Sequence, residues 1–164
     1  MGDAGRYRHP SPCPSRWRAA KKGGSHAQAL GRSRGGFGTK LHVCVDALGL
    51  PVRLLLGPGQ QNDMAPARDL IEGLPAQHVL ADRAYDADNL FDKILDQGGE
   101  VVIPPRRHRR FQHAYDKALY KERNRVERFF SRIKHCRRIA TRYDKLAQTF
   151  MGFVVLASIM LWLK

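Results

Sequence analysis

The chain of 164 residues carries 29 lysines and arginines against 15 aspartates and glutamates, which gives a formal net charge of +14. Its length suits one domain with a real core, and the excess positive charge favours a polyanionic partner such as nucleic acid. Three cysteines at unrelated spacings, and histidines without ligand spacing, argue against a disulfide framework and a zinc site and indicate a reduced cytoplasm.

Residues 1–36 are rich in glycine, proline, serine and arginine, which predicts a disordered or extended basic N-terminal segment. No strand is predicted in the first 20 residues, because the alternating Pro10, Pro12 and Pro14 remove backbone donors. The following glycine-rich stretch ends in Thr39 and Lys40, the reverse of the order in a phosphate loop, so nucleotide binding is not predicted. The folded domain is expected to span residues 37–164.

The first predicted element of this domain is a hairpin of residues 40–47 and 52–56, in which Asp46 and Gly49 belong to the turn. Asp46 is therefore expected to be a turn residue rather than a ligand. A short helix is predicted next, at about residues 64–72, with Asp63 as its N-cap and Gly73 as its stop.

A buried strand is predicted at residues 78–81, and it ends at Asp82. An acid at the carboxyl end of a buried strand is in the usual place for a site residue of an α/β sheet. The alternative is that Asp82 only caps the next turn. A helix over residues 87–97 follows, with Asp86 as its expected N-cap and Gly98 as its stop.

A strand over residues 100–103 and a basic loop over residues 106–110 lead into a long predicted helix at about residues 117–137. Tyr120, Arg123, Glu127 and Lys134 stand at offsets 0, 3, 7 and 14 along it. At about 100° per residue they fall within roughly 60° of one face, between an apolar face and a basic one. The alternative is an ordinary amphipathic helix in which Glu127 pairs with Arg123 at i, i+4.

The last predicted helix runs from residue 145, with Asp144 as its cap. Its apolar run over residues 150–163 is short of the ~20 residues that span a bilayer, so a buried helix is expected rather than a membrane anchor. The N-terminus lacks the order of regions found in a signal peptide.

The chain resembles the insertion-sequence transposases of the DDE superfamily, in the IS4/IS5-like group that carries a Tyr-x2-Arg-x3-Glu-x6-Lys signature. The signature corresponds here to Tyr120, Arg123, Glu127 and Lys134. Further blocks match in order, at residues 35–42, 45–49, 59–63, 81–85, 103–106 and 138–145. The resemblance implies an α/β fold similar to ribonuclease H (RNase H-like), with a mixed sheet flanked by helices.

In this family three carboxylates converge on two divalent metal ions, so the resemblance implies a two-metal site for Mg²⁺ or Mn²⁺. It implies that Asp82 is the second carboxylate and Glu127 the third, both as catalytic residues and as metal ligands. Arg123 and Lys134 are expected to hold DNA phosphates, and Tyr120 to lie near the strand that is cut.

The first carboxylate of the family stands upstream, in an Asp-Ser-Thr-like context that this sequence does not match; Asp3 is the only acid before Asp46. We therefore expect a fold that is incomplete at the first strand, in a chain truncated or frame-disturbed over residues 1 to about 20. Losing one of three ligands should weaken the metal pair, so we expect the chain to bind DNA but to transpose poorly or not at all.

The function expected from the resemblance is metal-dependent DNA cleavage and strand transfer at the ends of an insertion sequence. The expected partner is double-stranded DNA, both the transposon ends and the target, without a membrane; family members commonly work as homodimers. The expected location is the bacterial cytoplasm, at the nucleoid. Two alternatives stay open: a non-catalytic DNA-binding remnant of a transposase, and an RNase H-like nuclease without transposition.

Overall fold

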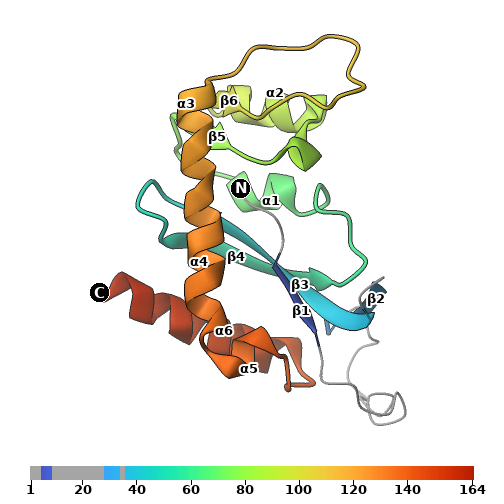
Figure 1. Cartoon of the computed structure of the whole chain (residues 1–164), viewed down its shortest axis with the longest axis vertical. Helices are drawn as coiled ribbons and strands as arrows, with labels where there is room; N and C mark the ends of the chain where they lie inside the picture. Colours follow the sequence, from blue (N-terminus) through green and yellow to red (C-terminus); the bar gives the residue numbers. More distant parts are fainter. Residues whose placement is uncertain (1–4, 9–27, 34–35) are drawn as a thin grey trace. The chain divides into compact units, whose positions relative to one another are not determined.

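The computed structural model describes residues 5–8, 28–33 and 36–164 (Figure 1). The described residues form two compact units. Unit 1 contains residues 42–54 and 62–128, and unit 2 contains residues 5–8, 28–33, 36–41, 55–61 and 129–164. The structure is mixed α/β, with small sheets and helices, as the sequence predicts.

One sheet is built around the long strand β3 (Gly36–Val45), which pairs with β1 (Gly5–Arg8), β2 (Gly31–Ser33) and β4 (Pro51–Pro58). The pairs of β3 with β1 and β2 are antiparallel. The expectation that no strand forms in the first 20 residues is wrong, because β1 pairs residue by residue with β3, from Gly5 opposite Leu41 to Arg8 opposite Gly38. The three prolines that argue against a strand all follow β1 in the sequence.

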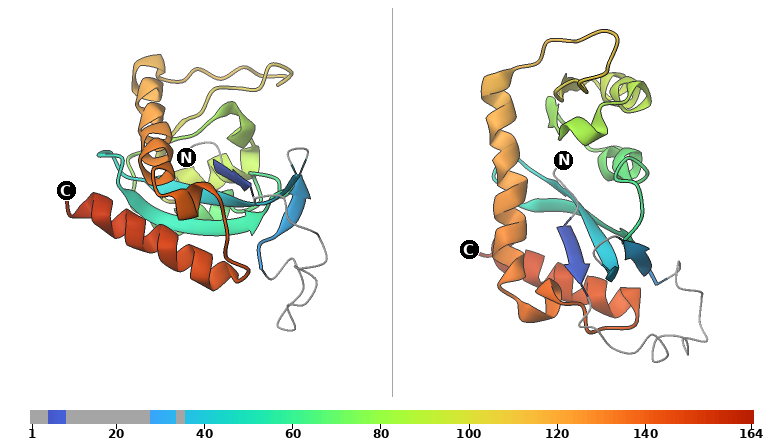
Figure 2. Two further views of the ribbon diagram at one scale, coloured as in Figure 1. Left: turned by 60° about the horizontal axis from the view of Figure 1, so that its bottom comes forward. Right: turned by 45° about the vertical axis from the view of Figure 1, so that its right-hand side comes forward.

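The predicted hairpin is confirmed, with longer strands than expected, and Figure 2 shows β3 and β4 side by side. Asp46 is a turn residue, because its Oδ1 accepts hydrogen bonds of 2.9 Å from the backbone N–H groups of Leu48 and Leu50. Gly49 has a φ of +81°, which favours glycine, and a Cβ built there would lie 3.4 Å from Cβ of Arg125. The turn therefore packs against the helical segment of the same unit.

Unit 1 continues with a two-stranded parallel sheet of β5 (His78–Leu80) and β6 (Glu100–Val102), joined through the short 3-10 helix η2 (Arg83–Tyr85) and α2 (Asp88–Asp96). α1 (Ala67–Ile71) precedes β5, and α3 (Lys117–Tyr120), the 3-10 helix η3 (Lys121–Arg123) and the start of α4 (Asn124–Lys134) follow β6. The core of this unit consists of apolar side chains, among them Leu70, Ile71, Ala81, Tyr85, Leu90, Ile94, Val102, Ile103 and Val126.

Unit 2 is completed by the end of α4, α5 (Arg137–Ala140) and α6 (Ala147–Trp162). Arg142 is fully buried in it. The guanidinium of Arg142 lies 5.1 Å from the ring centroid of Phe150 and donates to one hydroxyl and three carbonyls, those of Thr39, Gln28, Asp144 and Lys145. Burial lowers the pKa of Arg142 to about 10. This side chain therefore ties together segments of unit 2 that are about 100 residues apart in the sequence.

The long helix predicted over residues 117–137 begins where expected, with Asp116 as its N-cap, but it is not continuous. The 3-10 turn η3 interrupts it, and α4 ends at Lys134 before the short helix α5. The burial of Ile133 and Ile139 explains the second break: six residues apart on one α-helix their side chains would point about 120° away from each other, yet both are at most 2% exposed. A break between them lets both enter the core.

Three predicted helix caps are wrong. Asp86 binds Arg109, and Asp144 binds Arg138, and neither carboxylate caps a helix start. α1 begins after Pro66 rather than after Asp63, and α2 and α6 begin after Ala87 and Leu146, without a side-chain cap. The predicted glycine stops are confirmed at Gly73 and Gly98, which have φ values of +64° and +77°.

Two expectations about burial also need correction. β5 is not buried throughout, because His78 is exposed and Val79 and Leu80 are half-buried, whereas Ala81 is fully buried. α6 buries one face, that of Phe150, Val154, Ala157 and Ser158, while Leu156, Ile159, Met160 and Trp162 are exposed. No helix in the described part of the chain is long and apolar enough to cross a bilayer.

Candidate functional site

Asp82 stands two residues after the end of β5 and follows the buried Ala81. Its Oδ1 accepts a hydrogen bond of 2.8 Å from the backbone N–H of Arg83, so Asp82 is the N-cap of η2. The alternative prediction from the sequence, that Asp82 caps the next turn, is therefore confirmed for its local hydrogen bonding. The cap fixes the carboxylate at the end of β5, where its second oxygen, Oδ2, takes no part in the cap.

Tyr120 is the first residue of the signature, and its hydroxyl donates to Oδ1 of Asp82 over 3.4 Å. The Tyr120 ring packs edge-on against Tyr115, with the two ring centroids 5.5 Å apart. Partial burial raises the pKa of Tyr120, and the nearby charge of Asp82 raises it further. Tyr120 is therefore a neutral phenol that can donate to the Asp82 carboxylate over the whole physiological pH range.

Arg123 links Tyr120 to Glu127. Its Nη2 donates to Oε1 of Glu127 over 2.7 Å, and its Cζ lies 5.8 Å from the centroid of the Tyr120 ring. Burial opposes the charge of Arg123, but interactions with Tyr120 and with the two carboxylates outweigh burial and raise its pKa. The guanidinium is a permanent positive charge that is bonded to Glu127 and interacts electrostatically with Asp82.

Glu127 lies in the first turn of α4, and its side chain is 55% exposed. The alternative predicted from the sequence, an i, i+4 pair with Arg123, is present. Lys134, the last residue of α4, belongs to unit 2, where its Nζ lies 5.9 Å from the ring centroid of Phe130. Unit 1 thus joins Asp82, Tyr120, Arg123 and Glu127 in one series of contacts.

These contacts do not arise from a single regular α-helix. Tyr120 ends α3 and Arg123 ends the 3-10 turn η3, so the α-helical wheel used for the prediction does not hold between them. The structure links Tyr120, Arg123 and Glu127 through a helix, a 3-10 turn and a second helix, whereas Lys134 lies in unit 2.

The side chains present fit a divalent cation by their donor chemistry. Mg²⁺ prefers hard oxygen ligands such as carboxylates, and the described hydrogen bonds of Asp82 and Glu127 use Oδ1 and Oε1. In the described part of the chain, no three or more histidine, cysteine, aspartate or glutamate side chains gather in a metal-binding group. Arg123 is the cation that lies beside Glu127 in this structure, so a metal ion at Glu127 would compete with it.

The sequence predicts Asp86 as a helix cap, but its carboxylate binds the basic loop instead. Asp86 is only 3% exposed; its Oδ2 accepts from the backbone N–H of Arg106 over 2.6 Å, and its Oδ1 accepts from Nη1 of Arg109 over 2.5 Å. Arg106 in turn donates from Nη2 to the carbonyl of Ala84 over 2.7 Å. The basic loop is therefore fastened to the segment that directly follows Asp82. The run of arginines in the sequence indicates that an acidic partner exists, but it does not show which acid that is.

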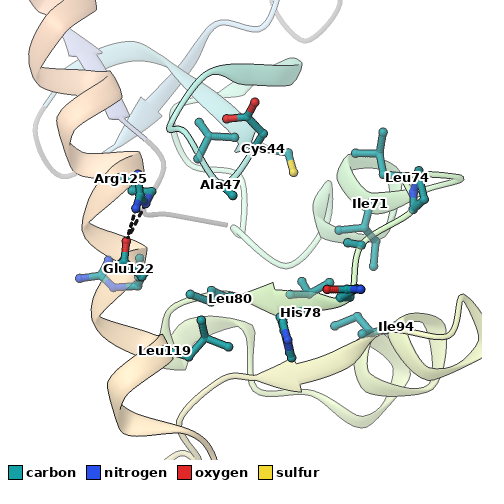
Figure 3. A pocket seen from close by; sticks show the side chains of 18 of the residues that line it. Cys44, Ala47, Ile71, Leu74, His78, Leu80, Ile94, Leu119, Glu122 and Arg125 are labelled. Carbon is teal, nitrogen blue, oxygen red and sulfur yellow. Dashed lines mark hydrogen bonds and ion pairs between the residues drawn. The ribbon is translucent and has the colours of Figure 1, made fainter.

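A cavity of about 460 Å³ lies in unit 1, and Figure 3 shows that side chains such as Leu80, Leu119 and Ile94 point into it. Glu122 and Arg125 form an ion pair of 2.6 Å on its lining. Arg123 also lines this cavity, whereas Asp82 and Glu127 do not. The cavity is mainly apolar and is not the place where the two acids present their oxygens.

Comparisons with known proteins agree with the resemblance found in the sequence. A model of the transposase DDE domain matches residues 9–162. The chain is 45% identical over 130 residues to a protein of Brucella ovis named as a transposase for insertion sequence element IS6501, covering 77% of this chain and 98% of that protein. It is 30% identical over 131 residues to a protein of Burkholderia cepacia named as a transposase for insertion sequence element IS402, covering 73% of this chain and 60% of that protein. No solved structure matches.

Proposed function

The chain belongs to the insertion-sequence transposases with a DDE domain, and on this premise we propose that it cuts and joins DNA at the ends of an insertion sequence in a metal-dependent reaction. One observation carries the proposal: two acids, a phenol and a guanidinium, from segments 38 residues apart, form one series of contacts in unit 1. These are the groups that a phosphodiester-cutting site needs.

Asp82 and Glu127 are the proposed metal ligands, because they present carboxylate oxygens at the end of a strand and at the start of a helix. Mg²⁺ or Mn²⁺ ions, when bound, would activate a water or 3′-hydroxyl and stabilise the departing oxygen. Arg123 and Lys134 are proposed to hold DNA phosphates. Tyr120 is proposed to orient the Asp82 carboxylate through its hydroxyl.

We assign the chain to the IS4/IS5-like group because the spacing of Tyr120, Arg123, Glu127 and Lys134 matches its signature. An RNase H-like fold is supported by the presence of both strand directions, antiparallel around β3 and parallel between β5 and β6. The proposed partner is double-stranded DNA, on which the chain assembles as a homodimer at the nucleoid. Sedimentation of the complex with one duplex end tests the dimer.

The proposed activity is weak, because the sequence does not contain the Asp-Ser-Thr-like context of the family's first carboxylate. We expect slow nicking in Mn²⁺ and little joining of cut ends. Efficient joining of labelled ends by the purified protein would contradict this part of the proposal while supporting the transposase function itself.

The test of the function combines metal binding with nicking of a duplex that carries the insertion-sequence end. Asp82→Asn and Glu127→Gln should each abolish nicking and weaken Mn²⁺ binding, measured by calorimetry. Glu122→Gln is the matched control, because Glu122 is an exposed acid of the same helical segment that pairs with Arg125. Nicking that survives in the double variant Asp82→Asn/Glu127→Gln would refute the proposed site.

The ion pair between Arg123 and Glu127 favours a second candidate function, DNA binding without cleavage, because Glu127 already has a cationic partner. In that case DNA binding would remain salt-sensitive, would not change in Asp82→Asn or Glu127→Gln, and would be accompanied by no nicking in either metal.

A further inference from the structure

The basic loop of residues 106–110, extended from here on to include Phe111 and Gln112, leads from β6 towards α3 in unit 1 (Figure 1). It is held at two places. Asp86 binds both the backbone N–H of Arg106 and the guanidinium of Arg109, and Arg109 also binds Asp88. Gln112 closes the loop on itself, because its Nε2 donates to the carbonyls of Arg106 and Arg109 over 3.0 and 2.9 Å. The base of the loop is therefore fixed in the folded protein.

The remaining side chains of the loop point into solvent. Arg107, His108 and Arg110 are exposed, and Phe111 is 76% exposed. The Cζ of Arg110 lies 5.5 Å from the centroid of the Phe111 ring. A single exposed apolar residue needs no explanation by itself. Here, however, an exposed aromatic ring lies among cations on a loop that the hydrogen bonds of the nearly buried Asp86 hold in place.

Aromatic rings flanked by positive charges are the elements with which proteins bind single-stranded nucleic acid, because every base has a face that can stack and every nucleotide has a phosphate. The net charge of +14 attracts the same ligand. The Arg106 guanidinium binds the carbonyl of Ala84, two residues after Asp82, so the loop is fastened to the chain next to a proposed catalytic acid.

We propose that the basic loop binds an unpaired end of DNA, with Phe111 stacked on an unpaired base and Arg107 and Arg110 on its phosphates. This inference rests on the proposed function for the choice of DNA as ligand, and it adds a binding site that the signature residues do not include. Arg106, Arg109 and Asp86 are positioning residues in it, since they hold the loop rather than contact the ligand.

The test uses the full chain and two short DNA duplexes of one sequence, one blunt and one with a few unpaired nucleotides that include 2-aminopurine. Binding is measured in EDTA, so the result does not depend on cleavage. We expect tighter binding to the unpaired end and quenching of 2-aminopurine fluorescence as its base stacks. Phe111→Ala should remove the quenching and weaken binding to the unpaired end on the order of 10-fold, while Phe111→Trp should retain both.

Leu95→Ala is the control, because Leu95 is a similarly exposed apolar residue, 61% exposed, on α2 of the same unit. It should bind like the original protein. Arg107→Ala should lower the salt dependence of binding by about one phosphate contact. Quenching and end preference that persist in Phe111→Ala would overturn the proposal. So would binding of anionic lipid vesicles that Phe111→Ala abolishes while DNA binding stays unchanged.

The two proposals fail in different ways. If metal-dependent nicking is absent but Phe111→Ala loses the unpaired end, the loop binds DNA in a protein without cleavage activity. If nicking depends on Asp82 and Glu127 but Phe111→Ala changes nothing, the acids act without this loop.

Discussion

The hydroxyl of Tyr120 donates a hydrogen bond of 3.4 Å to Oδ1 of Asp82, a residue 38 positions earlier in the chain. The same oxygen accepts the backbone N–H of Arg83. The donor and the cap together fix one oxygen of the carboxylate and leave Oδ2 outside both bonds. Asp82, which follows a strand, is therefore oriented by a residue of a distant helical segment.

The first prediction concerns the ionisation of Tyr120. Burial is the largest cause of its raised pKa, and the charge of Asp82 is the next. Asp82→Asn should therefore lower the pKa of Tyr120 but leave it above the ordinary value, because burial remains. The measurement is an ultraviolet titration of tyrosinate, taken as the difference from the same titration of Tyr120→Phe. A pKa that does not fall in Asp82→Asn would show that the two side chains do not interact in solution.

The second prediction concerns Arg123, which is expected to compete with a metal ion for Glu127. Arg123→Ala should raise the affinity of the protein for Mn²⁺, because Glu127 loses its cationic partner, and should lower its affinity for DNA, because a phosphate-binding cation is lost. Calorimetry with Mn²⁺ and a salt titration of DNA binding check the two effects. Arg132→Ala removes an exposed charge from the same helix and serves as the control. Loss of both affinities together would contradict the competition.

The third prediction concerns the anchoring of the basic loop by Asp86. Asp86→Asn keeps an acceptor for the N–H of Arg106 but removes the charge that pairs with Arg109. We expect faster amide exchange in residues 106–112 and a loss of about 1–3 kcal/mol in the free energy of unfolding, because a charged hydrogen bond of a buried group is lost. Asp88→Asn, at a side chain that is 78% exposed, should change amide exchange in the loop much less. Equal effects of the two variants would argue against Asp86 as the anchor.

The fourth prediction concerns Arg142, whose guanidinium serves one hydroxyl and three carbonyls from a fully buried position. Lysine has one nitrogen where arginine has three, so Arg142→Lys should leave some of these partners unpaired. Unpaired buried groups cost about 1–3 kcal/mol each, and we expect a loss of at least that size in the free energy of unfolding by urea. Arg132→Lys, at an exposed site, should be close to neutral.

Several elements were predictable because their signals are local. The turn at Asp46 and Gly49, the strand before Asp82, the helix start after Asp116 and the glycine stops each depend on residues a few positions apart. The i, i+4 pair of Arg123 and Glu127 was also foreseen, because both residues lie within one turn of a helical segment. α6 was predicted to be buried, but only one of its faces is. Its run of apolar residues does not indicate which face meets the core.

The sequence by itself determined the family of the protein and the residues of its proposed site, because spaced acids, cations and a phenol can be recognised without coordinates. Only the tertiary structure decided which partner each carboxylate takes. Asp86 binds the backbone N–H of Arg106 and the guanidinium of Arg109, 20 and 23 residues away, and Asp144 binds the guanidinium of Arg138, rather than the helix starts beside them. The physical reason is that folding brings donors from other segments within hydrogen-bond distance of these carboxylates, where they form strong charge-assisted bonds, and the residues next to each carboxylate do not encode which donor that is.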